Sequence, residues 1–281
     1  MSGRSLAVDV HRFTEGAESA RPDRVAIEEP LEIRIAFSTP DGRATRSVSI
    51  TMRTPDNDRE LAAGFLYSES IVRRAADIAA IETCGPPAPD TGNYNVVRVE
   101  LAAGVDVDLG RLERHFYTTS SCGVCGKTSL DALRVVGVEP LPPGGFAIAA
   151  DALIRVPDRL RGAQDTFEET GGLHAAAAFD ASGELVLTME DVGRHNAVDK
   201  VVGALLLDGR LPAGDLGLMV SGRASFELVQ KALVAGMPLL AAVGAPSSLA
   251  VSLADDFDMT LVGFLRGETF NIYAGQGRII R

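Results

Sequence analysis

The second half of the chain alternates short apolar runs with segments of helical periodicity, and this rhythm constrains the fold more than any other feature. Each apolar run has the length of a buried strand, and a helical segment separates it from the next run. Strand–helix–strand units bring strands together through right-handed crossovers, with helices covering the sheet. We therefore expect an α/β fold, built as a three-layer α/β/α domain on a mostly parallel or mixed sheet. The predicted strands are 173–179, 185–189, 216–220, 239–243, 260–265 and 270–273, and the predicted helices are 196–207, 225–235 and 247–254.

The first half has the pattern of a β-hairpin followed by one helix. Residues 31–37 alternate apolar and polar side chains, and residues 47–52 form the return strand after a Thr-Pro-Asp-Gly turn. Helix-capping residues at 54–58 then precede an apolar periodicity that ends near Val72. Residues 95–101 alternate again, which indicates a further strand in the same part of the chain.

A cluster of prolines and glycines at residues 141–145 marks a boundary between the two halves. Directly after it, residues 151–169 have a helical pattern that we expect to break into two pieces at Pro157. The first twenty residues are charged and small, with no apolar core of their own. The predicted units are a disordered lead-in at 1–20, an N-terminal α+β domain at 21–145 and an α/β/α domain at 146–281.

The bulk composition excludes several classes of protein. The net charge of −11 argues against duplex nucleic acid as a main partner. The chain has no apolar run long enough to cross a bilayer and no secretory signal pattern. Three cysteines do not make a disulfide framework in a chain of 281 residues, so we expect a cytoplasmic protein. Only three of its 27 basic residues are lysines, at Lys127, Lys200 and Lys231, and these positions are candidates for a role that arginine does not fill.

Two of the cysteines, Cys122 and Cys125, form a C-x-x-C pair flanked by glycines. A thiolate is the reactive form of cysteine, and Lys127 together with a following helix start favours that form. Two thiols at this spacing can also resolve each other's adducts as a disulfide. An accessible thiolate in a pliable, cationic segment suits a carrier of persulfide sulfur.

Structural zinc is the alternative for this cysteine pair. A zinc site commonly takes four ligands from two such pairs, or from one pair and two histidines. The chain has no second C-x-x-C, so Cys84 is the available third ligand, and His115 or His174 the fourth.

Polar or small residues follow several of the predicted strands. A string of eleven residues from Glu190 to Lys200 lies at a strand-to-helix turn, where backbone N–H groups and the helix dipole attract anions. Its Asp191 and Asn196 are alternatively ordinary helix caps. Ser221-Gly222-Arg223 and Gly244-Ala245-Pro246 occupy the same position after the next two strands, and Arg266 ends the last one. Turns in register along one sheet edge indicate a phosphate or nucleotide site. The candidate binding residues are Arg194, His195, Ser221, Gly222, Arg223, Phe264, Leu265, Arg266, Gly267, Glu268 and Thr269.

His174 begins a motif that is similar to the first part of a zinc deaminase signature, H-x-E. Ala176 stands where the catalytic glutamate would be, and no P-C-x-x-C follows, so the parts that activate a zinc-bound water are missing. The sequence is therefore compatible with a deaminase-like scaffold without deaminase chemistry. His174 is otherwise interpreted as a hydrogen-bonded strand residue.

Taken together, these motifs resemble one family, the formate dehydrogenase accessory sulfurtransferases of the FdhD type. The resemblance extends from about residue 27 to residue 273, and the string from Glu190 to Lys200 is its most specific part. The other matching segments are Thr54-Pro55, Glu60-Leu61-Ala62-Ala63-Gly64-Phe65-Leu66, Ser121-Cys122-Gly123-Val124-Cys125-Gly126, Ser221-Gly222-Arg223, Gly244-Ala245-Pro246-Ser247-Ser248, residues 264–267 and Asn271-Ile272-Tyr273.

The resemblance implies a cytidine-deaminase-like C-terminal domain and a homodimer. It implies that a cysteine desulfurase supplies persulfide sulfur and that the protein transfers it to the bis-molybdopterin guanine dinucleotide cofactor that formate dehydrogenase requires. By the family pattern Cys122 bears the persulfide and Cys125 assists, while residues 264–269 bind the cofactor, for which a guanine nucleotide is a mimic. No resident metal, nucleic-acid partner or membrane partner is expected. The alternative is a non-enzymatic chaperone that binds zinc or the molybdenum cofactor.

Overall fold

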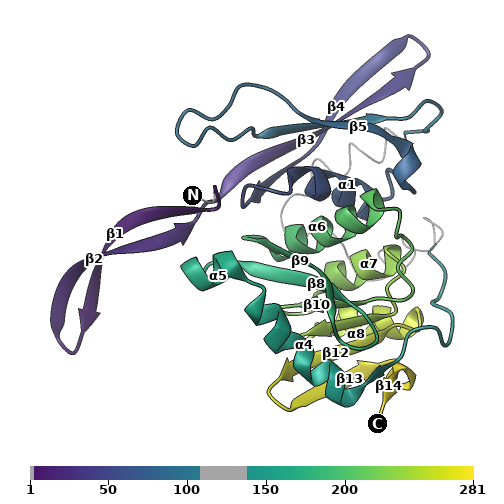
Figure 1. Ribbon diagram of the computed structural model, residues 1–281. Coiled ribbons are helices and arrows are strands. Elements are labelled where there is room, and N and C mark those ends of the chain that lie inside the picture. The colour runs from purple at the N-terminus through teal and green to yellow at the C-terminus, as the bar shows by residue number, and fades with distance from the viewer. Residues whose placement is uncertain (1–2, 108–137) are drawn as a thin grey trace.

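The structure is a computed structural model that describes residues 3–107 and 138–281 (Figure 1). Its C-terminal half is built on a six-stranded sheet with the order β13-β12-β11-β10-β8-β9. The strands β10, β11 and β12 are mutually parallel, whereas β8 and β13 run antiparallel to their neighbours. The predicted mixed sheet is therefore confirmed. Its strands are β8 (His174–Phe179), β9 (Leu185–Asp191), β10 (Gly217–Val220), β11 (Leu239–Ala242), β12 (Thr260–Arg266) and β13 (Thr269–Ala274).

Helices cover both faces of this sheet because its buried strands alternate their side chains between two cores. Ala176, Ala178 and Leu218 face the larger core, whereas Ala175 and Ala177 face the smaller one. The predicted α/β/α architecture is confirmed by this arrangement. On the larger-core face lie α6 (Arg194–Leu207), α7 (Phe226–Val234) and α8 (Ser248–Asp256), and on the other face lies α4 (Ala150–Gly162), followed by the short α5 (Asp165–Thr170).

The N-terminal half contributes a four-stranded sheet of order β4-β3-β6-β5 and the helix α1 (Asp58–Ser68). The predicted hairpin is present as β3 (Glu29–Thr39) and β4 (Gly42–Arg53). Strand β6 (Val96–Leu101) pairs in parallel with β3. Strand β5 (Ile78–Thr83) was not predicted, because its small and polar residues give no clear alternation. The remaining elements are the 3-10 turns η1 (Ala75–Asp77) and η2 (Gln276–Arg278) and a small parallel pair, β7 (Ile148–Ala149) with β14 (Ile279–Ile280).

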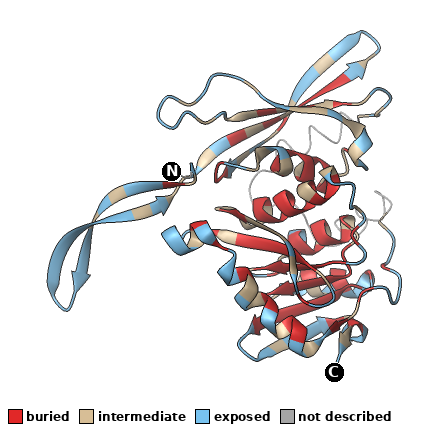
Figure 2. Ribbon diagram, viewed as in Figure 1, coloured by how far each residue is buried: buried red, intermediate tan, exposed pale blue. Residues whose placement is uncertain are grey.

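The two halves are joined by close packing of α1 on α6 (Figure 1). A Cβ atom on Gly64 would lie 1.8 Å from the carbonyl oxygen of Asp199, and one on Gly203 would lie 1.8 Å from that of Glu60. The helix backbones therefore touch where each lacks a side chain. One hydrophobic core extends from the four-stranded sheet through these helices to the six-stranded sheet, as the continuous buried region in Figure 2 shows. The division into units at 21–145 and 146–281 remains a prediction.

Two expectations about local structure were wrong. The lead-in at residues 1–20, expected to be disordered, contains β1 (Ser5–Thr14), which pairs with β2 (Ala17–Ala26) in a hairpin that projects from the body (Figure 1). The hairpin has no hydrophobic core of its own, and backbone pairing on both sides of the Glu15-Gly16 turn supports it. Pro157 does not break its helix, since α4 continues through it and ends at Gly162. A proline costs one hydrogen bond, and Val156 and Leu160 on either side are anchored in the smaller core.

Within the described parts of the chain, no helix combines the length and apolarity needed to cross a bilayer.

Candidate functional site

The strand-end turns predicted from the sequence lie together at one edge of the six-stranded sheet. The N–H of Ser221 donates to the carbonyl oxygen of Ala175 at 2.9 Å, and that of Gly244 donates to Gly222 at 2.9 Å. The N–H of Phe264 continues the row by donating to the carbonyl oxygen of Gly244 at 3.1 Å. We call this side the carboxyl edge, because the parallel strands β10, β11 and β12 all end there. In doubly wound sheets this is the edge at which ligands bind.

Small residues allow the turns of the carboxyl edge to pack against one another. A Cβ atom on Gly244 would lie 3.0 Å from both the Arg223 side chain and the Gly222 carbonyl oxygen. A Cβ atom on Gly263 would lie 2.9 Å from the ring of Pro246. Larger side chains would push these turns apart, so the glycines allow the backbones of neighbouring turns to lie in contact.

Residues 264–269, expected to bind the cofactor, span the end of β12, the Gly267-Glu268 turn and the first residue of β13. Phe264 has a φ of 54°, an uncommon value for an aromatic residue, and a register irregularity separates Gly263 from Arg266. The guanidinium of Arg266 lies 5.9 Å from the centre of the Phe264 ring. Arg266 is exposed and carries a positive charge beside a flat aromatic surface. Leu265 is buried in the smaller core, and Gly267, Glu268 and Thr269 are exposed.

Arg194 and His195 begin α6 beside the carboxyl edge, and both are partly buried. Neither Nε of Arg194 nor Nε2 of His195 has a hydrogen-bond partner among the described residues. His195 Nε2 stands 3.9 Å from a carboxylate oxygen of Glu227, which is an ion-pair distance. The proximity of His195 lowers the pKa of Glu227. Sequence reasoning missed Glu227, because an acidic residue in the first turn of a helix is ordinarily a helix-stabilising charge.

His174 belongs to this same group of side chains. The register pairs it with Asp191 on β9, and its ring lies against the Ser221-Gly222 turn, 3.5 Å from where a Cβ of Gly222 would be. The interpretation of His174 as a strand residue is confirmed, because His174 begins β8 and is paired in the β8–β9 ladder. Burial of the ring and the positive charges of Arg194 and His195 lower the pKa of His174.

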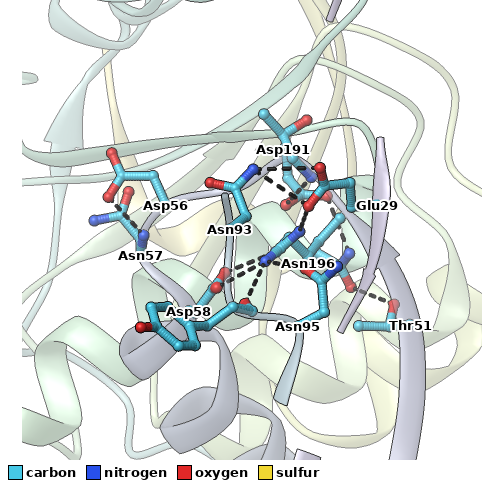
Figure 3. A network of polar contacts seen from close by, with 12 residues as sticks. Glu29, Thr51, Asp56, Asn57, Asp58, Asn93, Asn95, Asp191 and Asn196 are labelled. Carbon is cyan, nitrogen blue, oxygen red and sulfur yellow. Dashed lines mark hydrogen bonds and ion pairs between the residues drawn. The ribbon is translucent and has the colours of Figure 1, made fainter. Parts of the chain in front are cut away.

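Most of the Glu190-to-Lys200 string binds the two halves of the protein together and does not face the edge. Buried Asp191 accepts the N–H of Thr54 at 3.2 Å and pairs with Lys200 at 2.8 Å. Asn196 donates to the carbonyl oxygen of Met52 at 2.7 Å and accepts from Thr51 (Figure 3). Asp191 and Asn196 are therefore not the ordinary helix caps considered above, and only Arg194 and His195 of the string remain for a ligand.

Two further buried charges belong to the same string. Asp199 pairs with Lys231 of α7 at 2.8 Å and accepts from Ser68 of α1 at 2.8 Å. Glu190 accepts the backbone N–H groups of Thr166 and Phe167 at the start of α5. Both described lysines thus neutralise buried aspartates, a role that a larger guanidinium would not fit in the same space.

Arg53 is the centre of a second polar network at the start of α1. Its partners Glu29, Asp58 and Asn95 are labelled in Figure 3. Its fully buried guanidinium donates to both carboxylate oxygens of Asp58 at 2.9 Å. It donates to one carboxylate oxygen of Glu29 at 3.3 Å. It also donates to Asn95 at 3.1 Å. Asp58 was expected among the residues that cap α1, but its carboxylate is engaged by Arg53 and the helix has no side-chain cap. Asn57 precedes it with left-handed backbone. These acidic residues are neutralised internally and are not a metal site.

The predicted thiol residues Cys122 and Cys125 lie outside the described residues, as do Lys127 and His115. Cys84 follows β5, and its N–H donates to the carbonyl oxygen of Val96 at 2.9 Å. Among the described residues, no group of three or more histidine, cysteine or acidic side chains is arranged to hold a metal ion.

Comparison with known proteins identifies the family of this chain. The model of the FdhD/NarQ family matches residues 26–280, which is nearly the whole chain. The chain belongs to the FdhD/NarQ family. Its relatives include the sulfur carrier protein FdhD of Streptomyces avermitilis, 53% identical over 96% of this chain and 94% of that protein. The protein of the same name from Sulfurisphaera tokodaii is 40% identical over 97% of this chain and 98% of that protein.

A solved structure has the same fold as this chain. A crystal structure assigned to a formate dehydrogenase accessory protein from Desulfotalea psychrophila superposes with a TM-score of 0.74. It covers 99% of this chain and 100% of its own at 24% identity, which shows a shared fold. The resemblance drawn from the motifs is confirmed by the family match over residues 26–280 and by the relatives named above.

Proposed function

We propose that this chain is a cytoplasmic sulfur carrier, a sulfurtransferase that takes persulfide sulfur from a cysteine desulfurase and delivers it to a bis-molybdopterin guanine dinucleotide cofactor for formate dehydrogenase. The single observation that carries the proposal is membership of a family whose curated relatives, at 53% identity over nearly the full length, are named sulfur carriers. The name of the structural relative links the same fold to formate dehydrogenase.

The first step of the proposed transfer needs one thiolate. Cys122 attacks the terminal sulfur of the persulfide on the desulfurase. A bond forms between that sulfur and Cys122, the sulfur–sulfur bond of the donor breaks, and the donor cysteine leaves as a thiolate. Cys122 then holds the persulfide.

The second step needs an electron pair, which the neighbouring thiol supplies. The thiolate of Cys125 attacks the inner sulfur of the Cys122 persulfide, so that a disulfide forms and the outer sulfur leaves as sulfide for delivery to the cofactor. A cellular thiol reductant then reopens the disulfide. Cys125 thus has the assisting role.

The carboxyl edge suits the proposed substrate, which is large, aromatic and multiply anionic. Arg194, Arg223 and Arg266 bring positive charge to this one edge of an otherwise acidic chain, and His195 adds an imidazole ring beside them. The flat ring of Phe264 with its neighbouring guanidinium offers a surface for a guanine or pterin. A guanine nucleotide is the corresponding soluble mimic. The proposed protein acts as a homodimer.

The proposal is tested by activation of a formate dehydrogenase that depends on this chain. We expect Cys122→Ala to abolish formate dehydrogenase activity and Cys125→Ala to reduce it, because these residues hold and release the sulfur. Cys84→Ala is the matched control, since it removes a thiol outside the pair, and should leave activity intact. Full activation by Cys122→Ala, at normal levels of the carrier, would refute the proposal. Stoichiometric zinc on the purified protein, lost on replacing either Cys122 or Cys125, would favour the chaperone alternative.

A further inference from the structure

The β1–β2 hairpin carries apolar side chains that have no core to pack in. Among the residues that the structure describes, neither hydrophobic core contains a member of β1 or β2. Phe13, exposed by 72%, and Leu6, exposed by 56%, are the two most exposed large apolar side chains of the described chain. The hairpin extends away from the body in Figure 1 and is mostly exposed in Figure 2. An isolated two-stranded hairpin is only marginally stable in water, so a partner that covers it would stabilise it.

The register of the hairpin divides its side chains between two faces. Residues that pair across the two strands point to the same side, and the side alternates along each strand. We call one side the apolar hairpin face, and its side chains are Leu6, Val8, Val10, Arg12, Thr14, Ala17, Ser19, Arg21, Asp23 and Val25. The half of this face nearest the body combines a continuous apolar row on β1, at Leu6, Val8 and Val10, with one positive and one negative charge on β2.

The opposite face of the hairpin is the side that rests on the body. At its base the hydroxyl of Ser5 donates to Glu169 of α5 at 2.7 Å, and Arg24 forms an ion pair with the same carboxylate at 2.5 Å. Phe13 also belongs to this face, where it is the one large apolar side chain of the described hairpin, and single exposed apolar residues are ordinary. The apolar hairpin face is therefore turned away from α5.

The apolar hairpin face is complementary to a second copy of itself. A twofold axis that crosses the strands between the Val8–Asp23 pair and the Val10–Arg21 pair would place two hairpins face to face and antiparallel. Val8 then lies against Val10 of the second copy, and Asp23 lies against Arg21 of the second copy. Because the axis repeats each contact, the result is an apolar centre flanked by two intermolecular ion pairs.

A parallel arrangement of the two hairpins lacks this match. It would place Val8 against Asp23 of the second copy, which leaves a carboxylate covered by an apolar side chain. The antiparallel arrangement also keeps the two bodies apart. Each strand has ten residues. A strand of that length spans about 33 Å, so the bodies lie at opposite ends of the paired hairpins.

The charges of the hairpin permit this approach although the whole chain is acidic. The net charge of −11 makes two copies repel each other. Residues 5–26, however, contain three arginines and four acidic residues, so the hairpin is nearly neutral. Arg21 and Asp23 lie 3.7 Å apart within one chain, and their side chains are 45% and 48% exposed. Both charges therefore remain accessible to a second copy.

We propose that two copies of this chain associate through their apolar hairpin faces, in the antiparallel arrangement that brings Val8 against Val10 and Asp23 against Arg21 across the twofold axis. The inference rests on the homodimer of the proposed function and assigns the surface that forms it. Sulfur transfer by Cys122 is not part of the argument.

The test reverses one charge at a time in the full chain and measures association by sedimentation velocity and native mass spectrometry. Asp23→Arg puts a positive charge at both positions of the ion pair, and Arg21→Asp puts a negative charge at both. We expect each variant alone to dimerise about tenfold more weakly than wild type, because like charges then face each other across the axis. An equimolar mixture of the two variants should recover the dimer as a heterodimer, since every contact is again between opposite charges.

Asp9→Arg is the matched control, because it reverses an exposed acidic residue of the same hairpin on the opposite face, and it should dimerise as wild type does. Circular dichroism checks the fold of each variant, and recovery of the heterodimer shows that both hairpins are intact. Wild-type dimerisation by both charge variants would overturn the inference, as would a mixture that forms no more dimer than either variant alone.

The outcome for the wild type separates this inference from the proposed function. A dimer that forms through another surface would overturn the inference and leave the homodimer standing, whereas a monomeric wild type would overturn both. Neither result would affect the thiol experiment, in which Cys122 alone decides whether the chain carries sulfur.

Discussion

At the scale of single residues, one motif contains both buried, paired side chains and side chains with unpartnered nitrogens. Within the Glu190-to-Lys200 string, Asp191 and Lys200 are buried in an ion pair, whereas Arg194 and His195 keep free nitrogens at the carboxyl edge. The sequence predicted a strand-to-helix turn with anion-binding character for the whole string. The sequence did not separate the two groups, because a residue's identity does not show whether its charge becomes buried. Only the packing of β4 and α1 on this segment distinguishes them.

A substitution of Arg194 tests the electrostatic coupling at this point. Arg194→Gln removes a positive charge that lowers the pKa of His174, so we expect that pKa to rise. An NMR titration of the imidazole resonances measures it directly. Arg223→Gln is the control, since Arg223 is not among the charges that act on His174. An unchanged or lower His174 pKa in Arg194→Gln would show that the two side chains do not interact.

At the scale of elements, the contact between α1 and α6 determines how the N-terminal sheet is held. The sequence predicted both helices from their apolar periodicity and placed Gly64 in a matching motif, yet it did not reveal that Gly64 and Gly203 face each other. Strand β5 and the β1–β2 hairpin were missed for a related reason. Their residues carry few buried apolar side chains, and pairing with neighbouring backbone supports them where periodicity does not.

The glycine contact gives a sharp stability prediction. In Gly203→Ala the new methyl group would meet the Glu60 carbonyl oxygen, so we expect the free energy of unfolding to fall by about 3 kcal/mol. Gly162→Ala is matched to it as a helical glycine with nothing within 4 Å, and should raise stability by about 0.5 kcal/mol. Chemical denaturation followed by circular dichroism measures both. Equal effects of the two substitutions would mean that the helices do not touch at Gly203.

At the scale of the whole molecule, the larger core extends across the boundary that the sequence suggested at residues 141–145. Leu31 and Val99 of the N-terminal sheet belong to the same buried cluster as Leu218 and Leu261 of the C-terminal sheet. The Pro/Gly cluster at 141–145 correctly indicated a break in secondary structure, but a loop signal carries no information about which surfaces pack together. The fold class and most strands of the C-terminal half were predictable because buried strands and helices differ in periodicity.

A shared core predicts cooperative unfolding. We expect differential scanning calorimetry to show one main transition, with similar calorimetric and van't Hoff enthalpies, because separating the halves would expose the α1–α6 interface and its buried ion pairs. Two well-separated transitions, the second retained by a fragment beginning at residue 146, would show instead that the halves are independent.

The central claim is that this chain carries sulfur on one cysteine. The most direct measurement is mass spectrometry of the protein and its peptides after incubation with a cysteine desulfurase and free cysteine. Our account predicts the added mass of sulfur on the peptide containing Cys122, its loss in Cys122→Ala, and its persistence in Cys84→Ala. Sulfur that never appears on Cys122, or that remains bound to the chain in Cys122→Ala at the wild-type level, would contradict it.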